Sequence, residues 1–143
     1  MAAGPVTIPL DNLVLLFDGT FDLDTDTFNV ALFNSSFSTA TRFYSTTNEI
    51  AGVNGYTQGG EVVAGISLAE AAGVVTFDAD PVAWNASGGP ITARYAVIYK
   101  DGGSDPILGY ILLDTTPADV TVTDGNSLTI TWAANGIIRV TQA

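Results

Sequence analysis

The chain of 143 residues contains no cysteine and no histidine. Zinc sites built from these residues, cysteine nucleophiles, Ser-His-Asp triads and histidine acid–base chemistry are therefore excluded. Paired carboxylates are the acid–base groups that remain, and a glycosidase would need two of them facing each other across a cleft. Because the aspartates fall almost entirely in predicted turns, we expect a protein that is not an enzyme and that uses no cofactor or metal.

Basic residues are also scarce. Arg42, Arg94, Lys100 and Arg139 stand against fifteen acidic residues, which gives a net charge of −11. Since these four are scattered, they form no basic stripe that could neutralise phosphates. We therefore expect neither nucleic acids nor acidic membrane surfaces as partners. The longest apolar run, residues 13–17, is too short to cross a bilayer.

Charge of either sign is low for a chain of this size. Charged residues make up 13% of the sequence, compared with about 25% in a typical soluble domain, and the mean hydropathy is +0.33. The length corresponds to one domain, residues 1–143. A single domain this apolar is expected to hide surface against other subunits, so we predict a homo-oligomer. The first nine residues lack the features of a signal peptide, which favours synthesis and assembly in a cytoplasm.

Residues 91–113 form the centre of the predicted fold. In an extended chain, alternate residues share a face, and the residues of one face in the first half are Ile91, Ala93, Tyr95, Val97 and Tyr99. Residues 107–113 are apolar on both faces, as in a strand that is covered on both sides. The six residues between these runs are rich in Gly, Ser, Asp and Pro, so the stretch predicts a long β-hairpin.

Further strands are predicted on both sides of this hairpin. They cover residues 28–33, 61–68, 73–77, 82–84, 120–122, 128–132 and 137–140. About eight short strands separated by glycine-rich turns predict an all-β fold, an antiparallel β-sandwich of the jelly-roll or immunoglobulin-like type.

One short helix is predicted near the N-terminus, over residues 10–18. Leu10, Leu13, Val14 and Phe17 recur at helical spacing, and Gly19 suits the left-handed position just beyond a helix. A buried strand over residues 13–17 is the alternative, because periodicity cannot separate the two over five residues.

Residues 34–60 hold few strand patterns and many Ser, Thr, Asn and Gly residues. Aromatic residues such as Phe37 and Tyr44 predict that this long excursion is partly anchored. Loops of such length inside a compact domain usually bind something or are covered by a neighbouring molecule.

Asp22, Asp24 and Asp26 alternate ahead of the first strand. Carboxylates two residues apart begin many calcium loops. The EF-hand pattern, however, needs glycine and glutamate where this chain has Thr27 and Phe33. A solvated loop whose aspartates cap turns is therefore favoured over an ion site.

Several side chains of the predicted strands are expected to form the structural centre of the sandwich. Arg94 lies among apolar neighbours in mid-strand, so we predict that it pairs with a carboxylate. The alternative, if its face is exposed, is a contact that gives specificity to binding. Trp84 follows a period-two pattern that favours the core, and stacking on a sugar ring is the alternative. The predicted set comprises Trp84, Arg94, Tyr95, Tyr99 and Trp132.

A combination of sequence segments is similar to one group of known proteins. The segments are residues 26–36, 55–60, 84, 93–101, 108–110, 128–132 and 136–137. In combination they resemble small structural proteins of tailed bacteriophages, over about residues 19–138. The resemblance implies a virion component without enzymatic activity that is assembled in the host cytoplasm. It carries over no functional residue.

Two placements in a virion are compatible with this resemblance. A capsid decoration or cement protein would bind the major capsid protein on the outside of the shell, often as a trimer. A tail, adaptor or fibre-associated protein would lie in a ring or at a distal end. The acidic composition favours the outside of the shell over a DNA-lined channel. A carbohydrate-binding β-sandwich is the alternative outside the virion class, and it would expose Trp84, Tyr56 or Tyr44.

Overall fold

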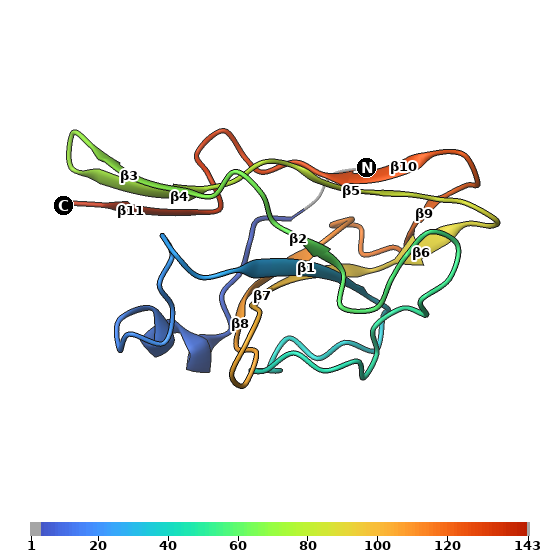
Figure 1. Ribbon diagram of the computed structural model, residues 1–143, viewed down its shortest axis with the longest axis horizontal. Coiled ribbons are helices and arrows are strands. Elements are labelled where there is room, and N and C mark those ends of the chain that lie inside the picture. Colours follow the sequence, from blue (N-terminus) through green and yellow to red (C-terminus); the bar gives the residue numbers. More distant parts are fainter. Residues whose placement is uncertain (1–3, 143) are drawn as a thin grey trace.

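The computed structural model describes residues 4–142, so residues 1–3 and 143 of the predicted domain lie outside this range. Two layers of antiparallel strands face each other, and one short 3₁₀ helix, η1, packs at one end (Figure 1). The predicted all-β sandwich is confirmed. The elements are η1 (Leu10–Leu16), β1 (Phe28–Phe33), β2 (Glu61–Val62), β3 (Ser67–Ala71), β4 (Val74–Asp78), β5 (Val82–Asn85), β6 (Ile91–Ala93), β7 (Tyr95–Lys100), β8 (Ile107–Leu112), β9 (Val120–Val122), β10 (Ser127–Ile130) and β11 (Ile138–Thr141).

Residues 4–142 contain eleven strands, whereas about eight were predicted. The difference arises mainly because two predicted strands are each divided. Residues 61–68 form β2 and β3, and residues 91–100 form β6 and β7. No helix in the described range is long and apolar enough to cross a membrane.

The lower layer contains the predicted central hairpin. Its strand order is β2-β1-β7-β8, and the β6–β9 pair continues the lines of β7 and β8 (Figure 1). The N-terminal segment adds a further edge, because Gly4 N–H donates to Leu112 O and Thr7 N–H to Tyr110 O, both at 2.8 Å. Strand β7 is therefore hydrogen-bonded on both sides, to β1 and to β8, as expected for the centre of a sheet.

The upper layer is built from two short sheets, β10-β5 and β11-β4-β3. They follow one another along the chain, because β4 leads into β5 and β10 leads into β11. The hydrogen bond from Ile137 N–H to Phe77 O, at 2.8 Å, extends the pairing of β11 with β4 by one residue. The β11-β4-β3 sheet extends past the end of the lower layer (Figure 1). All five residues of β3 are exposed, as are three of the four in β11, so this overhanging part contributes little to the core.

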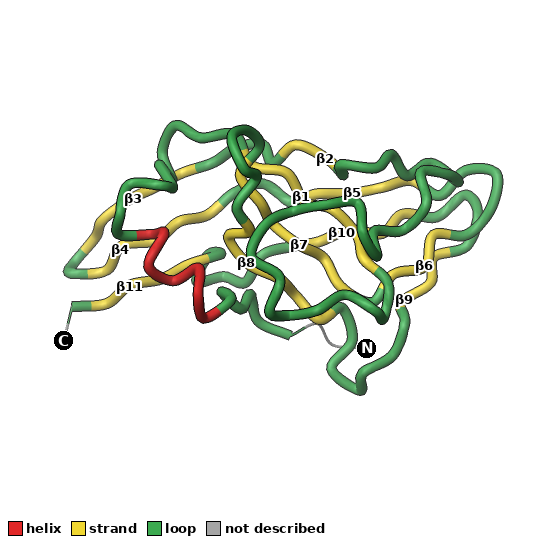
Figure 2. Tube along the Cα trace, turned by 90° about the horizontal axis from the view of Figure 1, so that it is seen from below, coloured by secondary structure: helices red, strands yellow, loops and turns green. Residues whose placement is uncertain are grey.

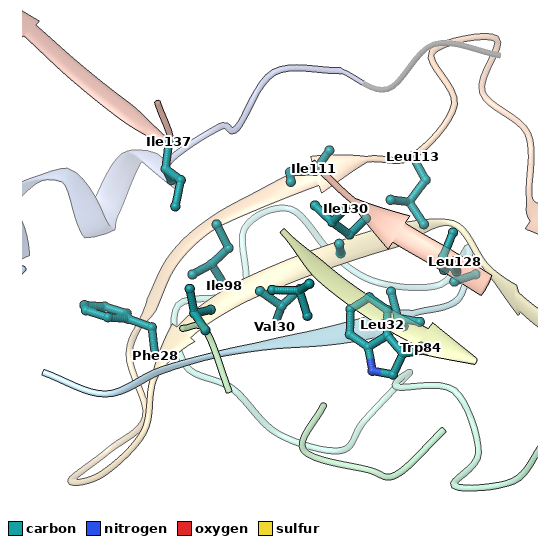
Figure 3. Packing of buried hydrophobic residues seen from close by; sticks show 14 of the residues in the cluster. Phe28, Val30, Leu32, Trp84, Ile98, Ile111, Leu113, Leu128, Ile130 and Ile137 are labelled. Atoms are coloured by element: carbon teal, nitrogen blue, oxygen red, sulfur yellow. The ribbon is translucent and has the colours of Figure 1, made fainter. Parts of the chain in front are cut away.

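The main core lies between the two layers. Its lower-layer side chains alternate along β1, where Phe28, Val30 and Leu32 are fully buried, and the upper layer contributes Trp84 and others (Figure 3). Each large apolar side chain that leaves water stabilises the fold by about 1.5–3 kcal/mol. A core of this kind needs neither disulfides nor metal.

The interruption at Arg94 changes which side chains of the central strand face the core. Ile91 and Ala93 were predicted to share a face with Val97. In the structure they pack in the main core together with Ala96, whereas Val97 lies in a second cluster on the opposite face. The backbone N–H of Arg94 donates to Phe33 O, and its carbonyl oxygen accepts from Leu113 N–H. Arg94 is thus one extra residue in the strand. The single-face prediction was therefore wrong, because a bulge of this kind reverses the alternation.

The outer face of the lower layer is covered by residues 34–60. Phe37 packs on Phe33 with ring centroids 4.9 Å apart, and Tyr44 stacks on Tyr99 at 4.0 Å. The second cluster of buried apolar residues lies beneath this cover. The central strands are thus covered on both faces, as predicted for residues 107–113. The long excursion, which we call the cover segment, packs on its own sheet.

Close packing of the cover segment against β1 depends on one glycine. Gly60 has φ +77°, and a Cβ atom at this position would collide with the carbonyl oxygen of Val30. Gly125 has a similar φ of +81° but has no atom within 4 Å of the same position.

We predict that Gly60→Ala lowers the free energy of unfolding by about 2–5 kcal/mol. This combines about 1–2 kcal/mol for the left-handed backbone with about 1–3 kcal/mol for overpacking. The matched Gly125→Ala change should cost only the backbone part, about 1–2 kcal/mol. Urea denaturation of both variants measures the difference, and equal losses would show that Gly60 does not need its small size.

Candidate functional site

The helix η1 is shorter than predicted and of a different type. It is a 3₁₀ helix that ends at Leu16, and no side chain caps it. Because a 3₁₀ helix has three residues per turn, residues three apart lie on one line. The inward line is Pro9, Asn12 and Leu15, and the first two are buried.

The apolar residues whose spacing indicated this helix point to solvent. Leu10 is 86% exposed, Phe17 is 79% exposed, and Leu13 and Val14 are also exposed. Leu10, Leu13 and Val14 lie on η1 and Phe17 directly follows it, so four exposed large apolar side chains fall within eight residues. Exposed apolar residues that gather in this way are uncommon on a monomer. We call these four residues the η1 surface.

The side chain of Asn12 anchors η1 to the rest of the protein. Its side chain is fully buried, and its amide nitrogen donates to Arg42 O and Ile107 O, both at 2.7 Å. Its oxygen accepts a hydrogen bond from Arg42 Nε at 3.0 Å. Arg42 Nη2 in turn donates to Asp11 O at 3.0 Å. The inner side of η1 is therefore fixed by polar contacts to the cover segment and to β8, and the apolar residues are left outside.

A second group of exposed apolar residues lies on the overhanging β11-β4-β3 sheet. Leu68, Val75 and Val140 share a face with the buried Phe77, because paired residues and alternate residues of a strand lie on one face. They extend the apolar inner face beyond the point where the lower layer ends. Figures 1 and 2 show η1 at this same end of the molecule, below the overhanging sheet. The exposed apolar residues of η1 and of this sheet thus gather at one end.

The cover segment contains a buried carboxylate, the side chain of Glu49. Its oxygens accept hydrogen bonds from Tyr56 Oη at 2.6 Å, Tyr44 Oη at 2.7 Å and the backbone N–H of Gly59 at 2.7 Å. Tyr56 Oη also accepts from the backbone N–H of Leu32 at 2.9 Å. The carboxylate is therefore occupied by three donors, and the network joins the cover segment to β1.

The tyrosines of this network are strongly perturbed. Burial raises the pKa of the Tyr56 phenol far above its ordinary value, and the hydrogen bond to Glu49 raises it further. The same two causes, in the same order, raise the pKa of Tyr44. Both phenols are thus held in the protonated form that can donate. This arrangement binds the chain to itself and presents no group that is free to accept a substrate proton.

The predicted structural centre is only partly brought together. Trp84 is 2% exposed, which confirms the core interpretation. Tyr95 and Tyr99 lie on the outer face of the lower layer with the second cluster. Trp132 is partly buried at the edge of the main core, where its Nε1 donates to Asp80 O at 2.9 Å. These residues therefore belong to separate regions of the fold.

Arg94 pairs with a carboxylate, as predicted. Its Nε lies 2.6 Å from Asp119 Oδ1, with 22% of the Arg94 side chain and 47% of the Asp119 side chain exposed. A pair so open to solvent contributes little to stability, about 0–1 kcal/mol. The confirmed ion pair is a surface contact beside the bulge.

The aspartates ahead of β1 form a hydrogen-bonded turn. Asp22 Oδ1 accepts from the backbone N–H groups of Asp24 and Thr25, and Asp26 Oδ2 accepts from Asp22 N–H at 2.7 Å. Asp26 also pairs with Lys100 at 2.8 Å. Within residues 4–142, no group of three or more acidic side chains is placed to hold a metal ion. The turn interpretation is confirmed for this segment.

A cavity of about 420 Å³ lies at the open edge between the layers. Its lining includes Val6, Ile111, Leu128, Ile130 and Trp132, and the described lining residues are apolar or neutral. It therefore does not supply the facing carboxylates that glycoside hydrolysis needs. Trp84 and Tyr56 are both buried, so neither offers a stacking face to a sugar.

Sequence reasoning missed the two buried polar residues, Asn12 and Glu49. Each lies in a stretch without strand periodicity, and its partners are distant in space or depend on how the cover segment folds. A polar residue on the inward line of a three-residue period is a signal that could have indicated Asn12. The sequence offers no comparable signal for Glu49.

We predict that Glu49→Gln lowers the free energy of unfolding by about 1–3 kcal/mol, because the amide cannot accept from all three donors. The matched change Glu61→Gln, at an exposed position, should stay within about 0.5 kcal/mol of the wild type. Urea denaturation of both variants tests this. Equal stability of the Glu49 variant and the wild type would contradict a role in holding the cover segment.

Alkaline pH should weaken the fold through the same tyrosines. Their folded-state pKa values are raised above the unfolded value of about 10, so their contribution is fully present below pH 10 and is lost above it. We expect the free energy of unfolding to fall from about pH 10 upwards, and to fall less steeply in Tyr56→Phe. Denaturation curves between pH 7 and pH 11 measure both slopes, and identical slopes would contradict the assignment.

Comparisons with protein-family models, with curated proteins and with solved structures find no match to this chain. Placement in a virion therefore stays a prediction. The most distinctive feature of the molecule is its apolar end, formed by η1 and the overhanging sheet.

Proposed function

We propose that this protein is a non-enzymatic structural component of a virion, a decoration or cement protein that binds the outer surface of a capsid shell. One observation carries the proposal. Large apolar side chains, among them Leu10 and Phe17 of η1 and Val140 of the overhanging sheet, are exposed at one end of a chain that has few charges. Exposed apolar groups that gather in this way are typical of a surface that another protein covers.

The pairing of the polar groups supports a binding role over a catalytic one. Glu49 is saturated by donors from its own chain, and Arg94 is paired with Asp119. The cavity at the open edge is apolar. The chemistry that these groups offer is packing and hydrogen bonding, which suits a protein that adds binding energy to an assembly.

Cementing follows from mass action. A protein that binds the mature shell and not its immature form adds its binding free energy to the stability of the mature form. Repetition by symmetry multiplies modest contacts, so no single strong site is needed. The net charge of −11 suits a position outside the shell, away from packaged DNA.

Self-association, with a trimer favoured, is part of the proposal, and the overhanging sheet is the region best suited to it. Its exposed Leu68, Val75 and Val140 share one face with Glu70, whereas Arg139 of β11 lies on the opposite face. Neighbouring copies that meet on the first face would cover these apolar side chains.

The test is a count of copies in intact particles of the virus whose genome encodes this chain. Quantitative mass spectrometry should find it in hundreds of copies per particle if it decorates the shell. A few dozen copies would instead indicate the alternative placement, in a tail, adaptor or fibre. Absence from purified particles would overturn the proposal.

A further inference from the structure

The η1 surface lies in a part of the chain with an excess of negative charge. Residues 10–26 contain five aspartates and no lysine or arginine. One of them, Asp26, is neutralised by its pair with Lys100. The other four are exposed to solvent: Asp11, Asp18, Asp22 and Asp24.

Two of these carboxyls have a lowered pKa. The hydroxyl of Thr20 hydrogen-bonds to Asp18 and lowers the pKa of that carboxyl. Thr25 does the same for the pKa of Asp22. Arg42, which donates to Asn12 and to the backbone of Asp11, brings one positive charge to η1, so four exposed carboxylates still outnumber it. An apolar centre is thus bordered by fixed negative charges, the arrangement of a protein interface with a polar rim.

We propose that the η1 surface docks a segment of a partner protein that presents apolar side chains bordered by lysine or arginine. Charge complementarity selects this partner, because a second copy of the chain would bring the same aspartates face to face. The inference rests on the proposed function and specifies the chemistry of the shell surface that this protein would recognise.

The surface is already in its binding shape. The buried Asn12 fixes η1 to the backbone of Arg42 and of Ile107, so docking does not have to order the helix. Association then loses less conformational entropy than it would on a flexible segment. The exposed Leu10 and Phe17 at the two ends of η1 are the natural anchors for a partner.

A peptide probe tests this chemistry without any particle. We would titrate the full chain into a fluorescently labelled helical peptide made only of leucine and lysine, with the leucines on one face. A second peptide has glutamate in place of every lysine. Fluorescence anisotropy should show binding of the lysine peptide at least tenfold tighter than binding of the glutamate peptide.

Two pairs of matched variants separate the η1 surface from general attraction to an acidic protein. Leu10→Ser with Phe17→Ser should weaken binding of the lysine peptide at least fivefold. Val53→Ser with Val62→Ser, which removes two exposed apolar residues elsewhere, should change it less than twofold.

The second comparison removes two negative charges, either beside the η1 surface or elsewhere on the molecule. Asp11→Asn with Asp18→Asn should weaken binding at least threefold, and Asp114→Asn with Asp124→Asn should weaken it less than twofold. Circular dichroism confirms that each variant is folded. The charge pair keeps the inference testable if the serine variant unfolds.

Three results would overturn the inference. They are no binding of the lysine peptide, equal binding of the two peptides, and equal effects within each pair of variants. Sedimentation provides a further test, since self-association that Leu10→Ser with Phe17→Ser abolishes would mean that a second copy occupies the surface. Failure of the proposed function is seen separately, as absence from particles.

Discussion

The structure depends on one constraint: the central strands β1, β7 and β8 are apolar on both faces, so water has to be excluded from both. The inner face is covered by the upper layer of the sandwich, which supplies Trp84 and its neighbours. The outer face has no second sheet and is covered by the cover segment, residues 34–60. A segment with little regular secondary structure therefore covers this face of the sheet, as a third layer of helices or strands does in other folds.

Such a cover cannot be held by apolar contacts alone, because its composition is mostly polar. The aromatic rings of Phe37 and Tyr44 bury part of it. Glu49 also anchors the segment, because its carboxylate accepts hydrogen bonds from three donors that would otherwise have no partner. Buried polar networks of this kind give a segment one defined conformation when every member is satisfied. The shape of the outer face thus depends on a few polar side chains.

Much of this fold could be predicted from local patterns, and the rest depends on contacts between distant segments. The period-two runs correctly predicted the hairpin, and the apolar run at residues 107–113 correctly predicted two-sided burial there. The break at Arg94 depends on hydrogen bonds to Phe33 and Leu113, which no local pattern shows. For η1, the spacing of apolar residues indicated a helix. Which side faces the core is decided by the partners of Asn12, and these lie 30 and 95 residues away.

Asn12 couples η1 to the cover segment, two parts of the molecule that would otherwise unfold independently. Its amide bonds to the cover segment at Arg42 and to the first residue of β8. Detaching η1 from the body therefore breaks contacts in both places at once, and loosening the cover segment releases η1. The helix and the cover segment form one cooperative unit for local unfolding. Slow exchange of backbone amide hydrogens in η1 would then depend on the cover segment, because a helix of seven residues is too short to be stable alone.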